Sequence, residues 1–368
     1  MRKGWEYKRW KEVLTIINGK NQSAVVDENG EYPIYGSGGI MGYANNWLCP
    51  ENCVIIGRKG NINKPIFVET KFWNVDTAFG LNANKEYLLP KFLYYFCLDY
   101  NFERHNKAVT IPSLTKVDLL KIDIPLPPKS TQLAIVSELD KINELIRLKK
   151  EQLKDFGNLA QSLFYEMFGD PVENEKGWEV KKIGDLALVK TGPFGSMLHK
   201  EDYICDGIPL VNPVHMKDFK IVPDLDFTIS KEKASELENY LLKSNDVVFA
   251  RRGDIGRCAI VSEAEQGFIC GTGSLFVRFS KEIESIFIMY IIRCDSFSKH
   301  LISKAKGATM LNINSNTIAD LRIPLPPLSL QRLFAQRIEQ IEREKSEVQK
   351  SIQDLETLLA SRMQYWFE

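Results

Sequence analysis

Residues 124–168 begin IPLPPKSTQLAIVSELDKI and end QSLFYEMF, and residues 323–367 begin IPLPPLSLQRLFAQRIEQI and end ASRMQYWF. The two stretches align without a gap at an offset of 199, which matches Gln132 with Gln331. Self-similarity at a fixed offset over a stretch of this length is the signature of a structural repeat. The chain therefore contains one segment twice, and we expect the rest of the fold to be organised around it.

Each copy has the signals of a long helix. The proline pairs Pro127–Pro128 and Pro326–Pro327 disfavour helix before them, because proline lacks an N–H and its ring restricts the preceding residue. Ser130 or Thr131, and Ser329, are candidate N-caps. We predict long spacer helices over residues 129–169 and 328–368.

The spacing of apolar residues indicates which kind of helix to expect. Steps of three and four alternate, as in the a/d seam of a coiled coil. The first seam comprises Leu139, Ile142, Ile146, Lys149, Leu153, Phe156, Ala160, Leu163 and Met167, and the second Ile338, Ile341, Lys345, Val348, Ile352, Leu355, Leu359, Arg362 and Trp366. A seam this narrow needs a partner to bury it. We predict that the two copies form an antiparallel coiled coil within a pseudo-two-fold internal repeat.

Two lysines interrupt the seams. Lys149 stands where the second copy has Val348, and Lys345 stands where the first has Ile146. In an antiparallel pair both fall near the centre, where the stems can pack while the amines reach water. The alternative is that they are ordinary solvated positions at the edge of the coiled coil.

Composition describes a globular protein without a membrane span. The chain has 368 residues, 44% of them hydrophobic and 26% charged, which fits two to three domains. It contains no run of eighteen apolar residues, and MRKGWEYKRWKEV at its start lacks the apolar region of a secretory signal. Seven scattered cysteines fit a reducing compartment, so we expect a cytoplasmic protein.

The charge balance excludes a generally basic, nucleic-acid-coating protein. The formal net charge is +0, with a net +3 over residues 1–128 and a net −2 over residues 170–327. A nucleic-acid surface would therefore have to come from local clustering of cations.

The regions preceding the two helices resemble each other. Both are rich in Gly, Pro, Asn and short β-branched or aromatic runs, as in mixed domains with many short strands. GWEYKRW at 4–10 matches GWEVKKI at 177–183, IIGRKGNI at 55–62 matches VFARRGDI at 248–255, and AVTIPSL at 108–114 matches GATMLNI at 307–313. The offsets of 173, 193 and 199 mean that framework segments are shared while the loops between them differ in length.

Both domains carry cations in a turn between two apolar runs. The first domain has the glycine-rich YGSGGIMGY at 35–43 and then a hairpin with Arg58, Lys59 and Lys64. The second has VKTGPFGSM at 189–197 and a hairpin with Arg251 and Arg252. Arginine beside glycine on a turn suits phosphate oxygens or a guanine edge. The alternative is a charged, solvated turn, although its recurrence in both repeats weakens that interpretation.

Catalytic motifs are missing from the sequence. It contains no G-x-x-x-x-G-K-[ST] loop, G-x-S-x-G elbow, H-E-x-x-H pair or C-x-x-C. The four histidines are isolated, and Cys49 and Cys53 have no second pair nearby, so we expect no metal site. Residues 212–215, Asn-Pro-Val-His, only superficially resemble an amino-methyltransferase motif and are interpreted as a turn after a strand.

Two variable domains, each followed by Pro-Leu-Pro-Pro, a glutamine and a long helix, resemble the specificity (S) subunit of type I restriction-modification enzymes. The resemblance is carried by Ile124–Pro128 with Gln132, by Ile323–Pro327 with Gln331, by both heptad helices and by the paired Arg-Lys-Gly and Arg-Arg-Gly turns. It implies an α+β protein in which residues 1–128 and 170–327 are target recognition domains of mixed α/β structure, and residues 129–169 and 328–368 are helical spacers.

The resemblance also implies a function. The chain would read an asymmetric bipartite target in double-stranded DNA, without catalysis of its own. Two modification (adenine methyltransferase) subunits and the restriction (motor-nuclease) subunits would dock on it, and S-adenosylmethionine, ATP and Mg would bind to those partners. Two alternatives stay open: a stand-alone DNA methyltransferase, and a coiled-coil scaffold whose globular ends bind protein or sugar.

The candidate DNA contacts are Arg58, Lys59, Asn61, Lys64, Tyr35, Ser37, Tyr43, Arg251, Arg252, Asp254, Arg257, Lys190, Phe194, Ser196, Lys304, Lys306 and Thr309. The candidate subunit-docking residues are Pro127, Pro128, Gln132, Pro326, Pro327 and Gln331.

Overall fold

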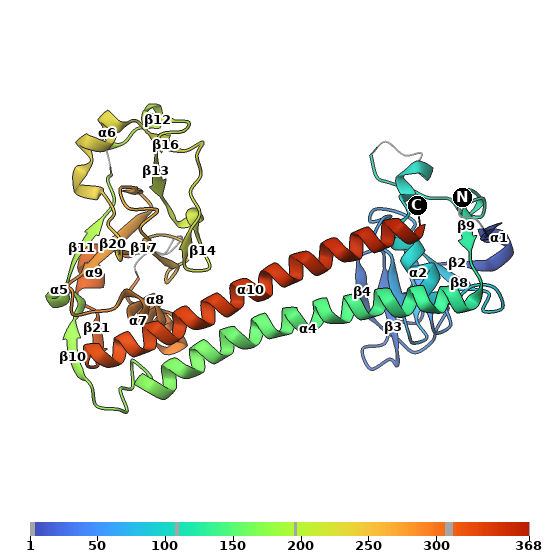
Figure 1. Cartoon of the computed structure of the whole chain (residues 1–368), viewed down its shortest axis with the longest axis horizontal. Helices are drawn as coiled ribbons and strands as arrows, with labels where there is room; N and C mark the ends of the chain where they lie inside the picture. Colours follow the sequence, from blue (N-terminus) through green and yellow to red (C-terminus); the bar gives the residue numbers. More distant parts are fainter. Residues whose placement is uncertain (1–3, 107–109, 195–196, 306–311, 368) are drawn as a thin grey trace. The chain divides into compact units, whose positions relative to one another are not determined.

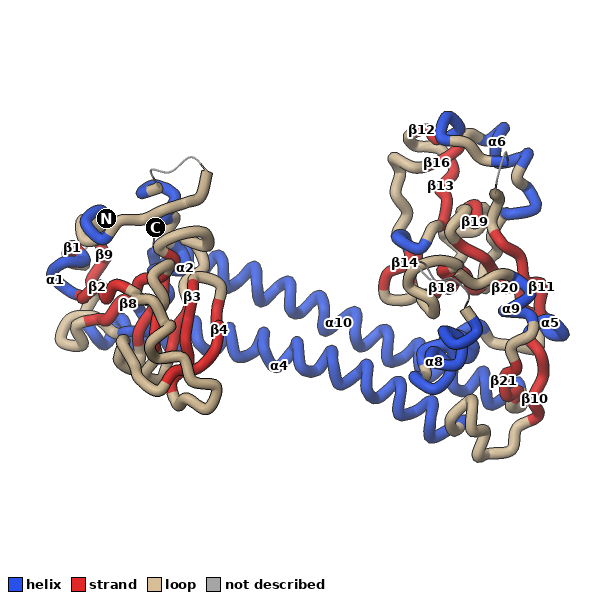
Figure 2. The backbone as a smooth tube through the Cα atoms, turned by 180° about the vertical axis from the view of Figure 1, so that it is seen from behind, coloured by secondary structure: helices blue, strands red, loops and turns tan. Residues whose placement is uncertain are grey.

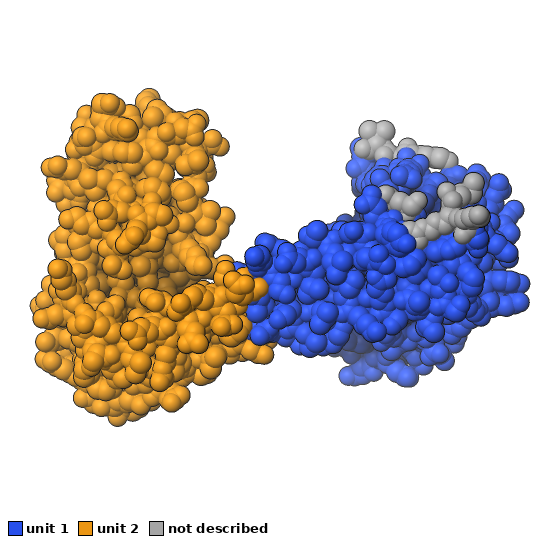
Figure 3. All heavy atoms as spheres, in the orientation of Figure 1, with its two compact units in different colours: residues 1–152, 348–368 blue, residues 153–347 orange. Residues whose placement is uncertain are grey.

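A computed structural model describes residues 4–106, 110–194, 197–305 and 312–367 (Figure 1). Helices and strands are both present throughout, so the chain is an α+β protein, as the sequence predicts. It divides into two compact units, coloured in Figure 3: unit 1 is residues 1–152 with 348–368, and unit 2 is residues 153–347. No helix in the described part of the chain is long and apolar enough to cross a membrane.

Unit 1 is built from short strands with a few helices. Before the long helices its elements are β1 (Glu6–Arg9), α1 (Trp10–Val13), β2 (Leu14–Asn18), β3 (Tyr32–Gly36), β4 (Gly39–Ala44), β5 (Cys53–Gly57), β6 (Ile66–Val68), β7 (Trp73–Asn74), β8 (Ala78–Ala83), α2 (Pro90–Asp99), η1 (Phe102–His105), α3 (Lys116–Leu119) and β9 (Asp123–Leu126). They form an antiparallel sheet in the order β2-β8-β5-β6, a sheet in the order β4-β3-β7 and the pair β1-β9.

The central strand β5 divides the core of unit 1 into two parts. All of its residues are buried, and successive side chains point to opposite faces. Val54 and Ile56 join the larger core under α2, whereas Cys53 and Ile55 join a smaller one. A strand with both faces covered reads as a continuous apolar run, which explains the sequence CVII.

Unit 2 repeats this plan with additional strands (Figure 2). Its elements are β10 (Glu179–Lys182), α5 (Ile183–Leu186), β11 (Ala187–Thr191), η3 (Lys200–Asp202), β12 (Tyr203–Ile204), β13 (Ile208–Val211), η4 (Pro213–His215), β14 (Met216–Lys217), β15 (Lys220–Ile221), β16 (Thr228–Ile229), α6 (Lys231–Glu236), η5 (Glu238–Tyr240), β17 (Val247–Ala250), β18 (Cys258–Ile260), β19 (Ile269–Cys270), β20 (Ser274–Phe279), α7 (Ser285–Arg293), α8 (Asp295–Lys304), α9 (Ser315–Ala319) and β21 (Arg322–Leu325). The sheet order β11-β20-β17-β18 corresponds to β2-β8-β5-β6, and the pair β10-β21 corresponds to β1-β9.

Two long helices complete both units. Helix α4 (Lys129–Phe168) begins in unit 1 and ends in unit 2, and α10 (Leu328–Phe367) begins in unit 2 and ends in unit 1. In unit 1, the guanidinium of Arg362 donates to the carboxylate of Glu138, and Lys150 Nζ lies 2.8 Å from Glu356 Oε1. Residue numbers thus rise along one helix as they fall along the other. The two segments run antiparallel.

The corresponding contact in unit 2 is aromatic. The Phe334 ring lies 5.6 Å from that of Phe164 and 5.3 Å from that of Phe168, between centroids. All three side chains are fully or almost fully buried. The last turns of α4 therefore pack on the first turns of α10 within this unit as well.

The seam residues are the covered ones. Every seam position predicted from the heptad spacing is buried or half-buried, including the two lysines. Lys149 Nζ donates to Gln152 and Lys345 Nζ to Glu342, each on its own helix. A lysine side chain favours this arrangement, because its aliphatic stem can pack in the seam while its charged amine reaches the edge.

The helices begin at the predicted residues, Lys129 and Leu328, but the predicted N-caps are wrong. Both helices begin directly after the second proline, because the amides of Gln132 and Gln331 donate to the carbonyls of Pro128 and Pro327. The serines and threonine proposed as N-caps therefore lie inside the first turn. A proline is tolerated at this place because the first amides of a helix have no partner within it.

The end of α10 closes the core of unit 1. The Phe367 ring lies 5.3 Å from that of Phe92 and 6.1 Å from that of Phe96 on α2. Trp366 stacks on Trp5 at an interplanar angle of 7° and donates its Nε1–H to Glu138. The last residues of the chain are thus part of the first domain.

We expect Glu138→Gln to destabilise unit 1 at neutral pH by no more than about 1 kcal/mol, because the Glu138–Arg362 pair is partly solvated. The hydrogen bond from Arg362 lowers the pKa of Glu138. A carboxylate whose pKa is lowered by folding stabilises the folded protein at pH values above the ordinary glutamate pKa. This stabilisation is lost as the pH falls through the pKa of the folded state. Urea unfolding of wild type and variant should therefore differ at pH 7 and converge in acid.

The matched control is Asp354→Asn, which removes an exposed carboxylate from α10. We expect its free energy of unfolding to lie within about 0.5 kcal/mol of the wild-type value. An equal effect of the two substitutions at pH 7 would contradict a specific contribution of the Glu138–Arg362 pair.

Candidate nucleic-acid interface

The cationic turn of the first domain lies in a hairpin, as predicted. Strands β5 and β6 pair antiparallel, with Ile55 opposite Ile66, and residues 58–65 form the loop between them. The paired strands are apolar because they line the core, whereas Lys59, Asn61 and Lys64 are exposed. The hairpin presents its polar tip outward.

The second domain has the equivalent hairpin. Strands β17 and β18 pair antiparallel, with Phe249 opposite Cys258, and residues 251–257 form the loop. Arg252 and Asp254 are exposed, and Arg251 and Arg257 lie at the two ends of the loop. Both predicted hairpins are therefore confirmed.

The same backbone hydrogen bonds hold the two loops. The carbonyl of Arg58 accepts from the amide of Leu114 at 2.9 Å, and that of Arg251 from Ile313 at 2.9 Å. Gly60 and Gly253 adopt φ values of +81° and +77°, a region that glycine enters without steric cost. The two loops thus share a frame and differ in the side chains mounted on it.

The first arginine of each loop is held by its own domain. Arg58 Nη1 donates to the Asp76 carbonyl at 3.4 Å, and the guanidinium lies 5.7 Å from the Phe79 ring. Arg251 Nε donates to Asn312 Oδ1 at 3.2 Å. Burial, and then the charge of Arg252, lower the pKa of Arg251. These two arginines brace their loops.

The second cation of each loop is differently placed. Lys59 and Arg252 are exposed, and neither forms an ion pair with a described residue. The backbone of each is fixed by an isolated antiparallel β-bridge, which pairs Lys59 with Ser113 and Arg252 with Asn312. A fixed backbone with an unpaired, solvated cation is suited to a phosphate or a base edge.

Arg257 and Asp254 neutralise each other. Arg257 Nη2 and Nε donate to Asp254 Oδ2 at 2.7 and 2.9 Å, and Nη1 donates to the Pro213 carbonyl at 3.2 Å. The pair is solvent-exposed, so a ligand could compete for it. The Arg257–Asp254 pair therefore presents less uncompensated positive charge than Lys59 or Arg252.

The glycine-rich stretch of the first domain meets the cationic loop. Residues 35–43 span the β3–β4 hairpin, in which Gly36 pairs with Gly39. A Cβ placed on Gly60 would lie 3.9 Å from Ser37 Oγ, so the two turns are neighbours. Tyr43 is 46% exposed, whereas Tyr35 is half-buried against Phe72, and burial raises the pKa of Tyr35.

The remaining predicted residues of the second domain are scattered. Lys190 Nζ lies 5.0 Å from the centroid of the Tyr240 ring, and Phe194 is 63% exposed. Lys304 is exposed at the end of α8. Ser196, Lys306 and Thr309 lie outside the described residues.

The predicted docking glutamines have an internal role. Gln132 is fully buried, accepts from the amide of Leu89 and donates to the Tyr87 and Pro127 carbonyls. Gln331 is also fully buried; it accepts from the amide of Glu284 and donates to the Pro326 carbonyl. Each amide ties the start of a long helix to its domain.

Because both glutamines are buried, a partner subunit could contact only the exposed residues around them. Pro127 and Pro326 are buried, whereas Pro128 and Pro327 are exposed. The docking prediction stays a prediction.

Asn312 was not among the predicted residues although it holds Arg251. Its segment recurs at the offset of 199, but nothing in the sequence states which loop it contacts. The Asn-Pro-Val-His stretch is a turn after strand β13, as interpreted above. Among the described residues no group of three or more His, Cys, Asp and Glu side chains is arranged to hold a metal ion.

The fold is similar to that of solved structures from type I restriction-modification systems. The chain superposes with a TM-score of 0.61 on the S subunit of a type I restriction-modification system from M. genitalium, at 15% identity and covering 99% of this chain and 96% of that one. A structure from a study of complex assembly and conformational transition of the type I R-M system gives a TM-score of 0.65 at 18% identity, covering 99% and 97%.

Sequence relatives agree with the structural ones. The type I restriction enzyme MjaVIII specificity subunit of Methanocaldococcus jannaschii is 23% identical over 96% of this chain and 92% of its own length. The EcoBI specificity subunit of Escherichia coli is 21% identical over 88% and 73%.

The family model described as the type I restriction modification DNA specificity domain matches residues 2–155 and again 175–357. The two matches together cover most of the chain and correspond to its two internally similar parts. The protein therefore belongs to the type I restriction-modification DNA specificity family, as a specificity subunit with two DNA-recognition regions.

Proposed function

We propose that this specificity subunit reads an asymmetric bipartite target in double-stranded DNA, with one recognition domain on each half-site. The observation that carries the proposal is the repeated hairpin: identical backbone hydrogen bonds hold Arg58–Asn61 and Arg251–Asp254. A shared frame with unlike side chains suits two readers of unlike sequences. The recognition domains are residues 1–128 and 170–327, and the spacers are residues 129–169 and 328–368.

The two loops divide their work between positioning and reading. Lys59 and Arg252 extend from fixed backbones into solvent, so they supply the contacts with phosphate or guanine. Asn61 and Asp254 occupy the next exposed position after the glycine. An amide suits adenine and a carboxylate suits the cytosine amino group, so different bases are expected at this place.

The helices act as the spacer between the half-sites, arranged as an antiparallel coiled coil in a pseudo-two-fold repeat. The antiparallel contacts inside each unit support this arrangement. Two readers joined by a stiff spacer bind with high effective concentration only where the half-sites have a matching separation. The gap between half-sites therefore follows from helix length.

Catalysis belongs to partner subunits in this proposal. Two modification subunits methylate adenine with S-adenosylmethionine, restriction subunits cleave with ATP and Mg, and this chain binds none of these cofactors. Large apolar side chains are exposed along both helices: Leu133, Leu145, Leu148, Leu159, Leu333 and Leu358. Exposed apolar residues on a helix pair are suited to covering by partners. The seven free thiols fit assembly in a reducing compartment such as the cytoplasm.

The central experiment is methylome sequencing of a host that carries this chain with its modification subunit. We expect two unlike half-sites separated by a fixed gap. Arg252→Ala should relax specificity at the half-site read by the second domain, and Lys59→Ala should do so at the half-site read by the first. Each substitution should cost roughly 1–3 kcal/mol of DNA-binding free energy if the cation reads a base.

The exposed Lys299→Ala on α8 serves as a charge-matched control that should leave the methylated set unchanged. Unchanged methylation and DNA affinity in both Arg251→Ala and Arg252→Ala would show that the second hairpin is not the reader.

The spacer role predicts the result of a paired deletion. Removing residues 147–153 and 347–353 deletes one heptad from each helix and retains the Glu138–Arg362 and Phe164–Phe334 contacts. Seven helical residues span about 10 Å, so the gap should shorten by about three base pairs. An intact complex that methylates the original spacing would refute the spacer role.

The division of labour predicts where the methyl donor binds. In equilibrium dialysis the purified chain should retain no S-adenosylmethionine, while its complex with modification subunits should retain it. Stoichiometric retention by the chain alone would favour a stand-alone methyltransferase.

A further inference from the structure

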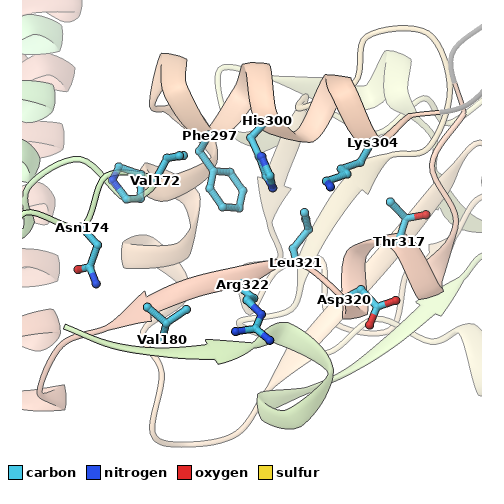
Figure 4. Close-up of a pocket in the computed structure, with 11 residues that line it drawn as sticks. Val172, Asn174, Val180, Phe297, His300, Lys304, Thr317, Asp320, Leu321 and Arg322 are labelled. Carbon is cyan, nitrogen blue, oxygen red and sulfur yellow. The ribbon is translucent and has the colours of Figure 1, made fainter. Parts of the chain in front are cut away.

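Unit 2 contains a cavity of about 680 Å³ between α8, α9 and the β10–β21 pair (Figure 4). It is open to solvent on one side, and its apolar wall includes Val172, Phe297 and Leu321. Figure 4 shows His300 and Lys304 descending from α8 toward the strand that carries Arg322. The lining cations Lys304 and Arg322 thus come from two elements, α8 and β21.

The cavity has an excess of positive charge. Lys304 and Arg322 form no ion pair with a described residue. Asp320 is the carboxylate among the described lining residues, and its Oδ1 lies 2.9 Å from Lys182 Nζ, so its charge is already shared. The lining residues thus include two cations without an ion-pair partner among the described residues, Lys304 and Arg322, together with His300.

The fold itself does not require this excess. In unit 1 the residue paired with Asp123 on β9 is Arg9, at the place where unit 2 pairs Arg322 with Lys182. At the offset of 199, Asp118 and Lys121 occupy the positions of Thr317 and Asp320. Unit 1 therefore has two cations and two carboxylates at these four positions, whereas unit 2 has two cations, Lys182 and Arg322, one carboxylate, Asp320, and the uncharged Thr317.

Lys304 and Arg322 are both exposed, so water screens the repulsion between them. Neither has a carboxylate partner among the described residues, so each can bind an anion. Lysine and arginine around a partly apolar cavity are suited to a phosphate group, which guanidinium binds with two parallel hydrogen bonds.

The chain connects this cavity to the recognition hairpin. Lys304 ends α8, and the segment that follows reaches Asn312, which bridges Arg252 and accepts from Arg251 Nε. Only seven residues separate Lys304 from Asn312. The cationic cavity is therefore continuous in sequence with the loop that the proposed function places on DNA.

We propose that this cavity binds a backbone phosphate of the DNA next to the half-site read by the β17–β18 hairpin, with Lys304 and Arg322 as the principal ligands. This inference rests on the proposed function and adds a sequence-independent anchor to it. Phosphate contacts fix the register of a protein on the duplex without carrying sequence information. The second domain would thus have a backbone clamp in addition to its reading hairpin.

The test compares Lys304→Gln and Arg322→Gln with Lys299→Gln, which removes a cation from the exposed side of the same helix. Affinity for duplex DNA is measured with the modification complex between 50 and 200 mM salt. Each cavity variant should lower the slope of log K against log salt by about 0.9, which is about a 3.5-fold smaller loss of affinity over this range. The control should retain the wild-type slope.

The methylated sequence set supplies the second readout. We expect both cavity variants to weaken all duplexes alike and to leave the target sequence unchanged, whereas a failure of the proposed function would appear as loss of the bipartite target itself. Titration with inorganic phosphate distinguishes a free-anion site. Phosphate binding to the wild type, with unchanged DNA salt slopes in the variants, would overturn the proposal, as would equal slopes for the variants and the control.

Discussion

A narrow apolar seam on a helix of 40 residues is the constraint on which the rest of this structure depends. Such a seam cannot be buried by the helix that carries it, so each copy needs a partner. Within unit 1 Leu139 shares a hydrophobic core with Leu359 and Trp366, and within unit 2 Ala160 and Leu163 share one with Ile338. Each domain is therefore completed by a helix segment from a distant part of the chain.

The two domains show how a shared backbone frame can carry different side-chain chemistry. Glycine at positive φ and a backbone hydrogen bond to a distant strand fix each loop, and neither depends on the exposed side chains. Lys59 and Arg252 can therefore change without disturbing the fold. The first arginines cannot be treated in this way, because Arg251 is partly buried and bonded to Asn312.

Much of the fold was predictable from the sequence because it is encoded by local periodicity and by internal repetition. The heptad spacing identified the covered face of both helices, and the alternation of apolar runs with glycine-rich turns located both hairpins. Contacts between residues far apart were not predictable. Gln132 bonds to Leu89 and Tyr87, and nothing in the local sequence distinguishes this buried amide from a surface glutamine. The same is true of Arg251 and Asn312, which are 61 residues apart. The positions of the two seam lysines were predictable, because the length and flexibility of a lysine side chain explain why the amine reaches the edge of the seam.

The completion of unit 1 by residues 348–368 has a consequence for synthesis. The first domain leaves the ribosome before Phe367 can cover Phe92 and Phe96, because Phe367 is translated after residues 153–347. At typical elongation rates of about 5–20 residues per second, the intervening 195 residues take roughly 10–40 s. During that interval the nascent chain exposes an aromatic surface complementary to the end of a long helix, so it is open to capture by chaperones or by a neighbouring nascent chain on the same message.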